Sequence, residues 1–260
     1  MKYYEQLVQL GCFTKNDVEQ LTGNSGTTYS LLQNYKKKGY IEQVKRNLYA
    51  AISMETKQPA ATRFQIASHI KPDSYITHHS AFEYYGYGNQ VFREVYVASK
   101  SKFAPFTYDD VSYRYIAPRI DSGVVQGRDG VRVTDLERTF VDSLNDFDRA
   151  AGLEELLRCL DLVPSLDEKK LLYYLEKYDK QFLFQKAGYL LAYFQIAFQL
   201  SDSFFDVCEK MTGKSVRYFY RGIEYESSVF NHCWKLFVPK NLMLIVSKGH
   251  DASRRGNHIP

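Results

Sequence analysis

The stretch NYKKKGYIEQVKRNLY, residues 34–49, indicates the fold of the first part of the chain. Three lysines run into Gly39, and glycine is the residue that most often ends a helix in a left-handed conformation. Two short β-like segments follow, residues 40–44 and 48–52, joined by Lys45-Arg46-Asn47. Asparagine tolerates the left-handed conformation that a tight turn requires. The order therefore predicts a helix that ends in cations and leads directly into a basic hairpin.

Two further helices are predicted ahead of this one. Residues 3–10 place apolar side chains at roughly helical spacing. In the second helix Thr14 is the expected N-cap, Asp17 lies in the first turn, and Gly23 ends the helix. The third helix is expected to begin near Ser25. Three helices followed by a hairpin are the element order of a winged helix-turn-helix, so residues 1–53 are predicted to form such a domain.

The third helix has a predicted buried face and a predicted polar face. Thr28, Leu31, Leu32 and Tyr35 recur at the spacing of a buried stripe, which leaves polar side chains on the opposite side. A helix in the major groove needs short polar side chains for base edges and nearby cations for phosphates. The candidate DNA-binding residues are Ser25, Thr27, Thr28, Ser30, Gln33 and Asn34, with Lys36, Lys37, Lys38, Lys45 and Arg46 as candidate phosphate contacts.

The charge of the chain is concentrated in this region. Residues 1–53 carry seven Lys/Arg against four Asp/Glu, an excess of three out of the +4 of the whole chain. Such an asymmetry favours a nucleic-acid-binding arm over a uniformly basic protein. The alternative interpretation is a small helical packing module whose lysines form a solvated patch.

The remaining residues are predicted to form a larger domain. Residues 54–64 read as a linker, residues 65–250 as a mixed α/β C-terminal domain and residues 251–260 as a flexible tail with a basic Ser253-Arg254-Arg255. The fold class is therefore α+β, with an N-terminal winged helix-turn-helix. The predicted strands are residues 95–99, 111–117, 131–133, 216–225 and 234–239, and the predicted helices are residues 136–147, 150–161, 167–177 and 181–200.

Other features narrow the class of protein. The cysteines Cys12, Cys159, Cys208 and Cys233 are scattered and include no C-x-x-C pair, so reduced buried thiols are expected. The N-terminus is too polar for a signal peptide, and polar residues interrupt the apolar stretch at 182–200. A cytoplasmic protein with no membrane partner and no cofactor is predicted.

Two patterns in the sequence are weak indications of metal-dependent chemistry. His78 and His79 with Glu83 one turn on could contribute two metal ligands, but no third partner is evident, and a short capped helix explains them as well. Asp73 and Glu94 resemble part of a nuclease core, but Tyr96 stands where that core needs a lysine. No nucleophile or phosphate-loop signature is present. The chain is therefore predicted not to be an enzyme.

Two acid- or base-rich stretches have similar competing explanations. Asp135, Glu137 and Arg138 could form a nuclease cluster, although helix capping accounts for the acids. Residues 217–221, RYFYR, alternate cations with aromatic rings and could stack on single-stranded RNA or meet a partner. A sheet strand with one buried aromatic face is the simpler interpretation of that stretch.

A series of short motifs along nearly the whole chain resembles the AbiEi antitoxins, transcriptional regulators of bacterial AbiE phage-defence systems. Relatives typically show R-G-L-Y where this chain has RNLY at residues 46–49, a mild departure because asparagine also adopts left-handed backbone. The other motifs are YITHHSA at 75–81, VYVA at 95–98, VRVTDLERT at 131–139, KAGYLL at 186–191 and WKL at 234–236.

The resemblance implies a protein of two parts. The N-terminal winged helix would bind repeats in double-stranded promoter DNA and repress its own operon. The C-terminal domain would neutralise a nucleotidyltransferase-like toxin in abortive infection, and in this class no stable complex with the toxin is assumed. Two other functions stay open: a phage-defence nuclease with a winged-helix targeting arm, and a metabolic repressor whose second domain senses a ligand.

Overall fold

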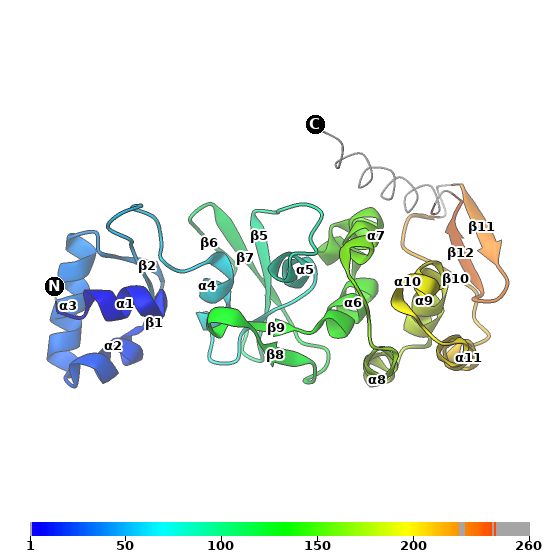
Figure 1. Cartoon of the computed structure of the whole chain (residues 1–260), viewed down its shortest axis with the longest axis horizontal. Coiled ribbons are helices and arrows are strands. Elements are labelled where there is room, and N and C mark those ends of the chain that lie inside the picture. The colour runs from blue at the N-terminus through cyan, green and yellow to red at the C-terminus, as the bar shows by residue number, and fades with distance from the viewer. Residues whose placement is uncertain (1, 224–226, 241, 243–260) are drawn as a thin grey trace, which may run out of the picture. The chain divides into compact units, whose positions relative to one another are not determined.

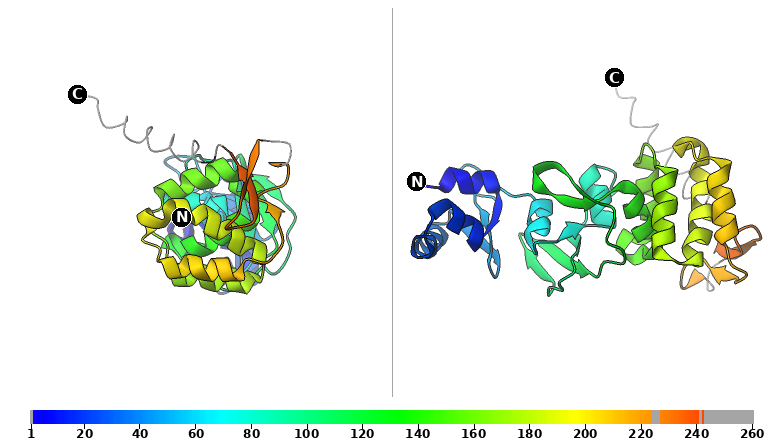
Figure 2. Two further views of the ribbon diagram at one scale, coloured as in Figure 1. Left: turned by 90° about the vertical axis from the view of Figure 1, so that its right-hand side faces the viewer. Right: turned by 90° about the horizontal axis from the view of Figure 1, so that it is seen from below.

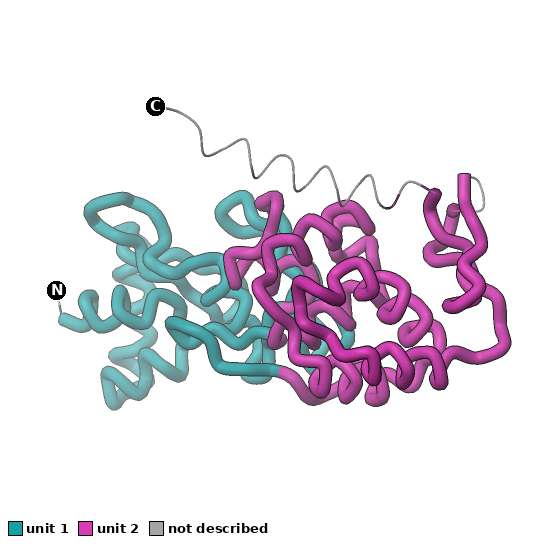
Figure 3. The backbone as a smooth tube through the Cα atoms, turned by 45° about the vertical axis from the view of Figure 1, so that its right-hand side comes forward, with its two compact units in different colours: residues 1–76, 92–118, 124–133 teal, residues 77–91, 119–123, 134–260 magenta. Residues whose placement is uncertain are grey.

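The computed structural model describes residues 2–223, 227–240 and 242. It combines helices with three sheets in the described part of the chain, which confirms the predicted mixed α/β class (Figure 1). The backbone divides into two compact units that the chain enters more than once (Figure 3). Unit 1 comprises residues 1–76, 92–118 and 124–133, and unit 2 comprises residues 77–91, 119–123 and 134–260, within the limits of the described ranges.

The first part of unit 1 contains the helices and hairpin that the sequence predicts, here called the N-terminal module (residues 2–53). A three-stranded antiparallel sheet of order β1-β3-β2 packs with three helices. Its elements are α1 (Tyr4–Leu10), β1 (Cys12–Thr14), α2 (Lys15–Thr22), α3 (Ser25–Lys37), β2 (Ile41–Lys45) and β3 (Leu48–Ala51). Strand β1 was not predicted, because three residues that end at a helix N-cap are too few to show a strand pattern.

Local signals fix the boundaries of these helices. The Thr14 hydroxyl accepts a hydrogen bond from the Asp17 backbone N–H, and the Asp17 carboxylate accepts one from the Thr14 backbone N–H, which is a capping box. Gly23 follows α2 with a φ of 70°. The core of the module is formed by side chains from every helix and strand: Leu7, Phe13, Val18, Leu32, Ile41 and Ala51.

The segment predicted as a linker is closed into a turn at its start. The backbone N–H of Ser53 donates to the carbonyl of Gln58, 2.9 Å away, and Ile52 and Pro59 form an isolated β-bridge. Helix α4 (Arg63–His69) then begins with Thr62 as N-cap and Gln65 completing a capping box.

The second part of unit 1 is a mixed six-stranded sheet of order β6-β7-β5-β4-β9-β8. Strands β5 and β7 pair in parallel, with Val95 opposite Tyr113 and Val97 opposite Tyr115. Three of the predicted strands are confirmed within a residue or two. The strands are β4 (Tyr75–Ile76), β5 (Glu94–Ala98), β6 (Phe106–Tyr108), β7 (Val111–Ile116), β8 (Val124–Gln126) and β9 (Arg132–Thr134).

Unit 2 is mainly helical, with α6, α8 and α9 packed against one another and α11 against α9 (Figure 2). Its helices are α5 (His79–Tyr85), α6 (Leu136–Asn145), α7 (Gly152–Leu162), α8 (Glu168–Tyr178), α9 (Gln181–Leu191), α10 (Gln195–Phe198) and α11 (Asp202–Met211). A small sheet of order β10-β12-β11 follows, from β10 (Arg217–Tyr218), β11 (Ser228–Asn231) and β12 (Leu236–Pro239). Short 3-10 turns at Arg128–Gly130 in unit 1, and at Phe147–Ala150 and Ala192–Phe194 in unit 2, complete the elements.

One close approach brings together two of the motifs behind the family resemblance. Gly188 of α9 lies against the indole ring of Trp234, and a Cβ at Gly188 would come within 2.2 Å of that ring. The amide of Gln185 donates to the carbonyl of Trp234, 3.1 Å away. Glycine is therefore required at this position for α9 to pack on the small sheet.

Several boundaries in unit 2 differ from the predictions. The helix predicted for residues 181–200 is broken by the 3-10 turn Ala192–Phe194, and the strand predicted for 216–225 is limited to Arg217–Tyr218 among the described residues. Helix α11 and strand β11 were not predicted. The predicted tail and its Ser253-Arg254-Arg255 lie outside the described residues. None of the described helices is long and apolar enough to cross a membrane.

Candidate nucleic-acid interface

Helix α3 is held at both ends by backbone and side-chain hydrogen bonds. Its N-cap is Asn24, one residue before the predicted position, and the Asn24 side chain accepts a hydrogen bond from the Thr27 backbone N–H at 3.0 Å. At the other end Gly39 has a φ of 69° and donates its N–H to the Lys36 carbonyl. A non-glycine residue at Gly39 would be strained, so this residue fixes where the helix turns into β2.

The candidate DNA-binding residues in the first turns of α3 are exposed, with one exception. Five of the six candidate residues that precede the lysines are exposed: Ser25, Thr27, Ser30, Gln33 and Asn34. Thr28 is 0% exposed, so the prediction that it contacts DNA is wrong. Thr28 is a core residue of the module. Its hydroxyl donates to the Asn24 carbonyl at 2.9 Å and lies 2.6 Å from the Thr22 hydroxyl. A helical position facing the core cannot also face a groove.

An aromatic side chain that was not predicted adjoins this face. Tyr29 on α3 is 63% exposed. Tyr29 follows Thr28 directly, so it lies off the buried stripe that Thr28 and Leu32 define. This position in the helical period could have identified Tyr29 from the sequence. A tyrosine ring beside Ser30 and Gln33 adds an apolar surface and a hydroxyl to a set of small polar groups.

The three lysines at the end of α3 and Arg46 in the turn are exposed. The Lys36 ammonium donates to the Gln43 side-chain oxygen, 2.8 Å away, which links α3 to β2. A cavity of about 510 Å³ lies along this side of the hairpin. Its lining residues are Lys36, Gly39, Ile41, Glu42, Gln43, Lys45 and Arg46. Helix α3 and the hairpin thus form one continuous surface on which cations outnumber acids.

Lys45 differs from the other candidate cations because aromatic rings cover it. Its ammonium lies 5.0 Å from the ring centroid of Phe103 and 4.7 Å from that of Phe106. Burial lowers the pKa of Lys45, and the nearby charge of Lys71 lowers this pKa further. The predicted phosphate contact at Lys45 is therefore engaged within unit 1, and Arg46 is the exposed cation of the turn.

A hydrogen bond also joins the same hairpin to the six-stranded sheet of unit 1. The Tyr108 hydroxyl donates to the Glu42 carboxylate, 3.0 Å away. Burial, and then the bond to Glu42, raise the pKa of Tyr108. Together with the stacking of Lys45, this contact holds β2 against the segment around β6.

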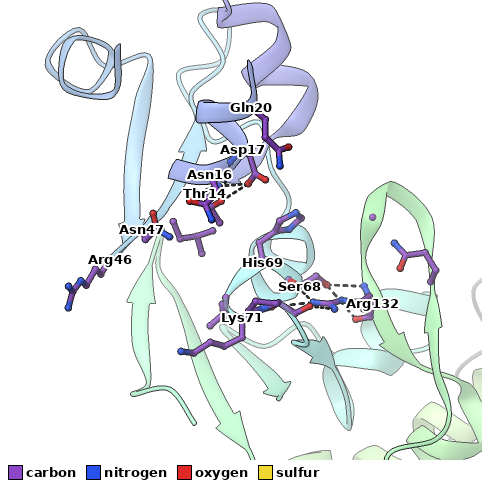
Figure 4. Close-up of a pocket in the computed structure, with 15 residues that line it drawn as sticks. Thr14, Asn16, Asp17, Gln20, Arg46, Asn47, Ser68, His69, Lys71 and Arg132 are labelled. Carbon is purple, nitrogen blue, oxygen red and sulfur yellow. Dashed lines mark hydrogen bonds between the residues drawn. The ribbon is translucent and has the colours of Figure 1, made fainter. Parts of the chain in front are cut away.

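A cavity of about 740 Å³ lies on the opposite side of the hairpin turn, between α2, the end of α4 and β9 (Figure 4). Arg46 lines it from the hairpin turn, and His69 lies on the side of Asp17 and Gln20 (Figure 4). The Arg132 guanidinium donates to the carbonyls of Ser68 at 2.8 Å, of Lys71 at 3.2 Å and of Pro72. Arg132 therefore caps the end of α4 and is not a free cation of this cavity.

The predicted nuclease carboxylates have separate partners. Asp73 accepts a hydrogen bond from the Lys100 backbone N–H at 2.6 Å, and Glu94 pairs with Arg114 at 2.8 Å. Asp135 accepts the Arg138 backbone N–H as the N-cap of α6, as helix capping predicts. Within the described residues, a single group of three potential metal ligands is found, and it contains none of these carboxylates.

The aromatic stretch at residues 217–221 has one buried ring. Phe219 is fully buried in the core of unit 2, while Arg217 and Tyr218 are exposed. Tyr218 stacks on Phe237 of β12. The simpler interpretation, a sheet strand with one buried aromatic position, is the one that the structure supports.

The sequence matches no known protein-family model, and no curated protein is similar to it at a significant level. A crystal structure of the RV2827C protein from Mycobacterium tuberculosis is similar to this chain, with a TM-score of 0.62 at 16% sequence identity. The similarity covers 96% of this chain and 94% of that one. At this identity the likeness is one of fold, and it extends over the arrangement of helices and sheets described above.

Proposed function

We propose that the N-terminal module is a winged helix-turn-helix that binds double-stranded DNA, and that the chain is an antitoxin and autorepressor of the AbiEi type. In this proposal α3 enters the major groove and the β2–β3 hairpin is the wing. Promoter repeats of its own operon are the expected target. The chain is proposed to have no catalytic activity of its own.

The observation that carries the DNA-binding proposal is the outward face of α3. Ser30, Gln33 and Lys37 lie on it, and Lys36 and Lys38 flank it in the last turn. Side chains of this kind donate to and accept from base edges, while cations within a turn of them neutralise phosphates. Arg46 supports the same reading, because an exposed cation at a hairpin tip suits a phosphate or the minor groove.

The antitoxin part rests on the family resemblance, whose motifs span both units. We propose that unit 2 and the sheet of unit 1 oppose a nucleotidyltransferase-like toxin without forming a stable complex with it. Repression and neutralisation would then be separable by mutation, because the DNA contacts lie in the N-terminal module alone.

The DNA-binding proposal is tested by gel-shift salt titrations of the full chain on the DNA directly upstream of its gene and on random DNA. With Lys36, Lys37, Lys38 and Arg46 as phosphate contacts, log affinity should fall with log salt at a slope of roughly −3 to −4. Replacing Lys37 and Arg46 with alanine should flatten that slope by about two.

The matched control replaces two exposed lysines of unit 2, Lys210 and Lys214, with alanine. This variant loses the same formal charge and should keep the slope of the unmodified chain. Equal slopes for both double variants, or equal affinity for upstream and random DNA, would contradict a specific interface on α3.

Neutralisation is tested by growth of cells that express a nucleotidyltransferase-like toxin of the AbiE type together with this chain. The Lys37→Ala, Arg46→Ala variant should lose repression and still restore growth. If restoration of growth is lost together with DNA binding, the two activities are not separable in the way proposed here.

One observation favours a second candidate, a repressor that senses a small molecule. Unit 2 contains a cavity of about 1040 Å³ between the α6–α7 region and β10. It combines aromatic rings with charges of both signs, including Phe182, Tyr220, Lys186, Arg217 and Asp146. A compound that raises the melting temperature and also releases DNA would support this candidate, whereas DNA binding that no such stabilising compound alters would favour the antitoxin.

A further inference from the structure

Three potential metal ligands from two helices of unit 2 meet in the interior. His79 begins α5, and Glu155 and Cys159 lie one turn apart on α7. The His79 Nε2 atom is 2.9 Å from the Glu155 Oε1 atom, and the Cys159 Sγ atom is 3.6 Å from the same oxygen. All three side chains are buried, and their ligand atoms lie within 4.8 Å of one another.

The imidazole of His79 faces a carboxylate on each side. Its Nδ1 atom is 3.0 Å from the Glu83 Oε1 atom, one turn further along α5, and its Nε2 atom faces Glu155. A neutral imidazole carries one N–H, so it can donate to one carboxylate and presents a lone pair to the other. One of the two contacts therefore needs a positive charge between nitrogen and carboxylate, either a proton or a cation, and the Nε2 side is the one on which Glu155 and Cys159 add two further ligand atoms.

The contact between His79 and Glu83 has the geometry of the outer contact that metal-bound histidines make. Histidines that bind metals usually donate the second ring N–H to a carboxylate, which fixes the tautomer and the orientation of the ring. Donation from Nδ1 to Glu83 would direct the Nε2 lone pair toward the side of Glu155 and Cys159. Glu155 is itself oriented from outside, by the Asn89 side chain at 3.1 Å and the Gln90 backbone N–H at 3.1 Å.

We propose that His79, Glu155 and Cys159 bind one divalent transition-metal ion of the zinc class, with Glu83 orienting His79. One nitrogen, one oxygen and one sulfur ligand suit zinc, whereas magnesium and calcium select oxygen ligands. Bond lengths of about 2.0–2.3 Å in a tetrahedral site place ligand atoms roughly 3.3–3.7 Å apart. The nitrogen–oxygen pair therefore has to open by a few tenths of an ångström, and the oxygen–sulfur pair already fits. The nitrogen–sulfur pair lies within 4.8 Å and has to close by up to about 1 Å.

The ion would serve to join α5 to α7 inside unit 2. The ion would bind the thiolate form of Cys159, so metal binding releases the thiol proton. A water molecule would be the fourth ligand of the ion. The site is independent of the DNA-binding proposal, because no candidate DNA contact belongs to it.

The test uses the full chain with the exposed Cys233 replaced by serine, which removes the one cysteine that the structure places at the surface. This protein is treated with chelator and titrated with Co²⁺, and Zn²⁺ is then added as the competitor. The expected result is one Co²⁺ per chain, with a thiolate-to-cobalt charge-transfer band that Zn²⁺ removes. Glu83→Gln should weaken binding by about 10–100-fold.

The matched pair of variants is Cys159→Ser and Cys208→Ser in the same background, because both thiols are fully buried. Cys159→Ser should lose the charge-transfer band and Cys208→Ser should keep it. A band that survives in Cys159→Ser shows an adventitious ion only. The absence of saturable binding in the folded Cys233→Ser protein would overturn the proposal even if Cys159→Ser failed to fold.

Discussion

The side-chain oxygen of Asn47 accepts a hydrogen bond from the backbone N–H of Lys15, 3.2 Å away. Asn47 has a φ of 62°, the left-handed conformation predicted for the hairpin turn. The residue therefore acts twice: its backbone closes the β2–β3 turn, and its side chain satisfies one of the free N–H groups at the start of α2.

We expect Asn47→Gly and Asn47→Ala to separate these two roles. Both variants lose the bond to Lys15, but only alanine is strained in a left-handed conformation, by about 1–2 kcal/mol. Asn47→Ala should therefore unfold with a free energy about 1 kcal/mol lower than that of Asn47→Gly, as measured by urea denaturation. Equal stabilities would mean that the turn relaxes to another conformation.

A second prediction concerns the corrected residue Thr28. Thr28→Val keeps the shape of a fully buried side chain and removes its contacts with Thr22 and Asn24. We expect a loss of about 1–2 kcal/mol in the free energy of unfolding, because the partner hydroxyl at Thr22 loses a bond. Under conditions in which the variant is folded, its DNA affinity should be unchanged.

The exposed neighbour Thr27 provides the comparison for Thr28. Thr27→Val should change stability by less than about 0.5 kcal/mol, since its side chain is exposed. It should weaken binding to upstream DNA if α3 enters the groove. The opposite pattern, with Thr28→Val affecting affinity and Thr27→Val affecting stability, would show that the phase of α3 on DNA is wrong.

Lys45 and Arg46 are adjacent, and we predict different effects on DNA binding. Lys45→Met keeps an apolar chain against Phe103 and Phe106, and should leave the salt slope of DNA binding within about half a unit of its original value. Arg46→Met should flatten the slope by about one, as expected for the loss of one phosphate contact. Gel-shift titrations of the two single variants measure this directly. A flattened slope for Lys45→Met would show that Lys45 leaves the aromatic rings on DNA.

The N-terminal module could be predicted because its signals are local. The caps at Thr14 and Gly23, the glycine at residue 39 and the turn at Asn47 each specify backbone within a few residues. Strand β1 could not be predicted, because its three residues become a strand only by pairing with β3. Local capping and turn chemistry thus fixed the helices and the hairpin, while pairing fixed the sheet.

The contacts that alter the predicted roles of Lys45 and His79 join residues that are far apart in the sequence. Lys45 is covered by rings more than fifty residues later, and His79 meets Glu155 across 76 positions. Periodicity assigns a residue to a face but does not identify its neighbour in another element. For the same reason His79 and Glu83 appeared to lack a further ligand partner, since Glu155 and Cys159 come from a helix of another region.

The buried ion pair in α6 provides a fourth prediction. The Arg138 guanidinium is 2.7 Å from the Asp142 carboxylate, and the two side chains are 2% and 3% exposed. Asp142→Asn would leave a buried charge without its counterion, which typically costs about 3–5 kcal/mol of stability. Asp142 also accepts hydrogen bonds from Thr77 and Tyr178, so the loss should lie toward the upper end. Asp148→Asn, at an exposed position, is the control and should change stability by less than about 0.5 kcal/mol.

The last prediction is a pH dependence that originates at Lys186. Its ammonium lies 4.2 Å from the ring centroid of Phe147 and 4.6 Å from that of Phe182, and it donates to the Leu144 carbonyl at 3.2 Å. Burial lowers the pKa of Lys186 from 10.5 to about 8, against the opposing effect of Asp146. Between these two pKa values the unfolded chain binds a proton that the folded chain has released.

This difference makes the free energy of unfolding rise with pH from about 8 toward 10.5, by about 1 kcal/mol per pH unit. Urea denaturation at pH 8, 8.75 and 9.5 measures the free energy of unfolding. It should rise with pH more steeply for the unmodified chain than for Lys186→Met, by about 1 kcal/mol per pH unit. Lys169→Met removes an exposed lysine and should leave the pH dependence unchanged. If Lys186→Met and the unmodified chain show the same pH dependence, Lys186 stays protonated in its aromatic surroundings, and its attraction to the rings outweighs the cost of its burial.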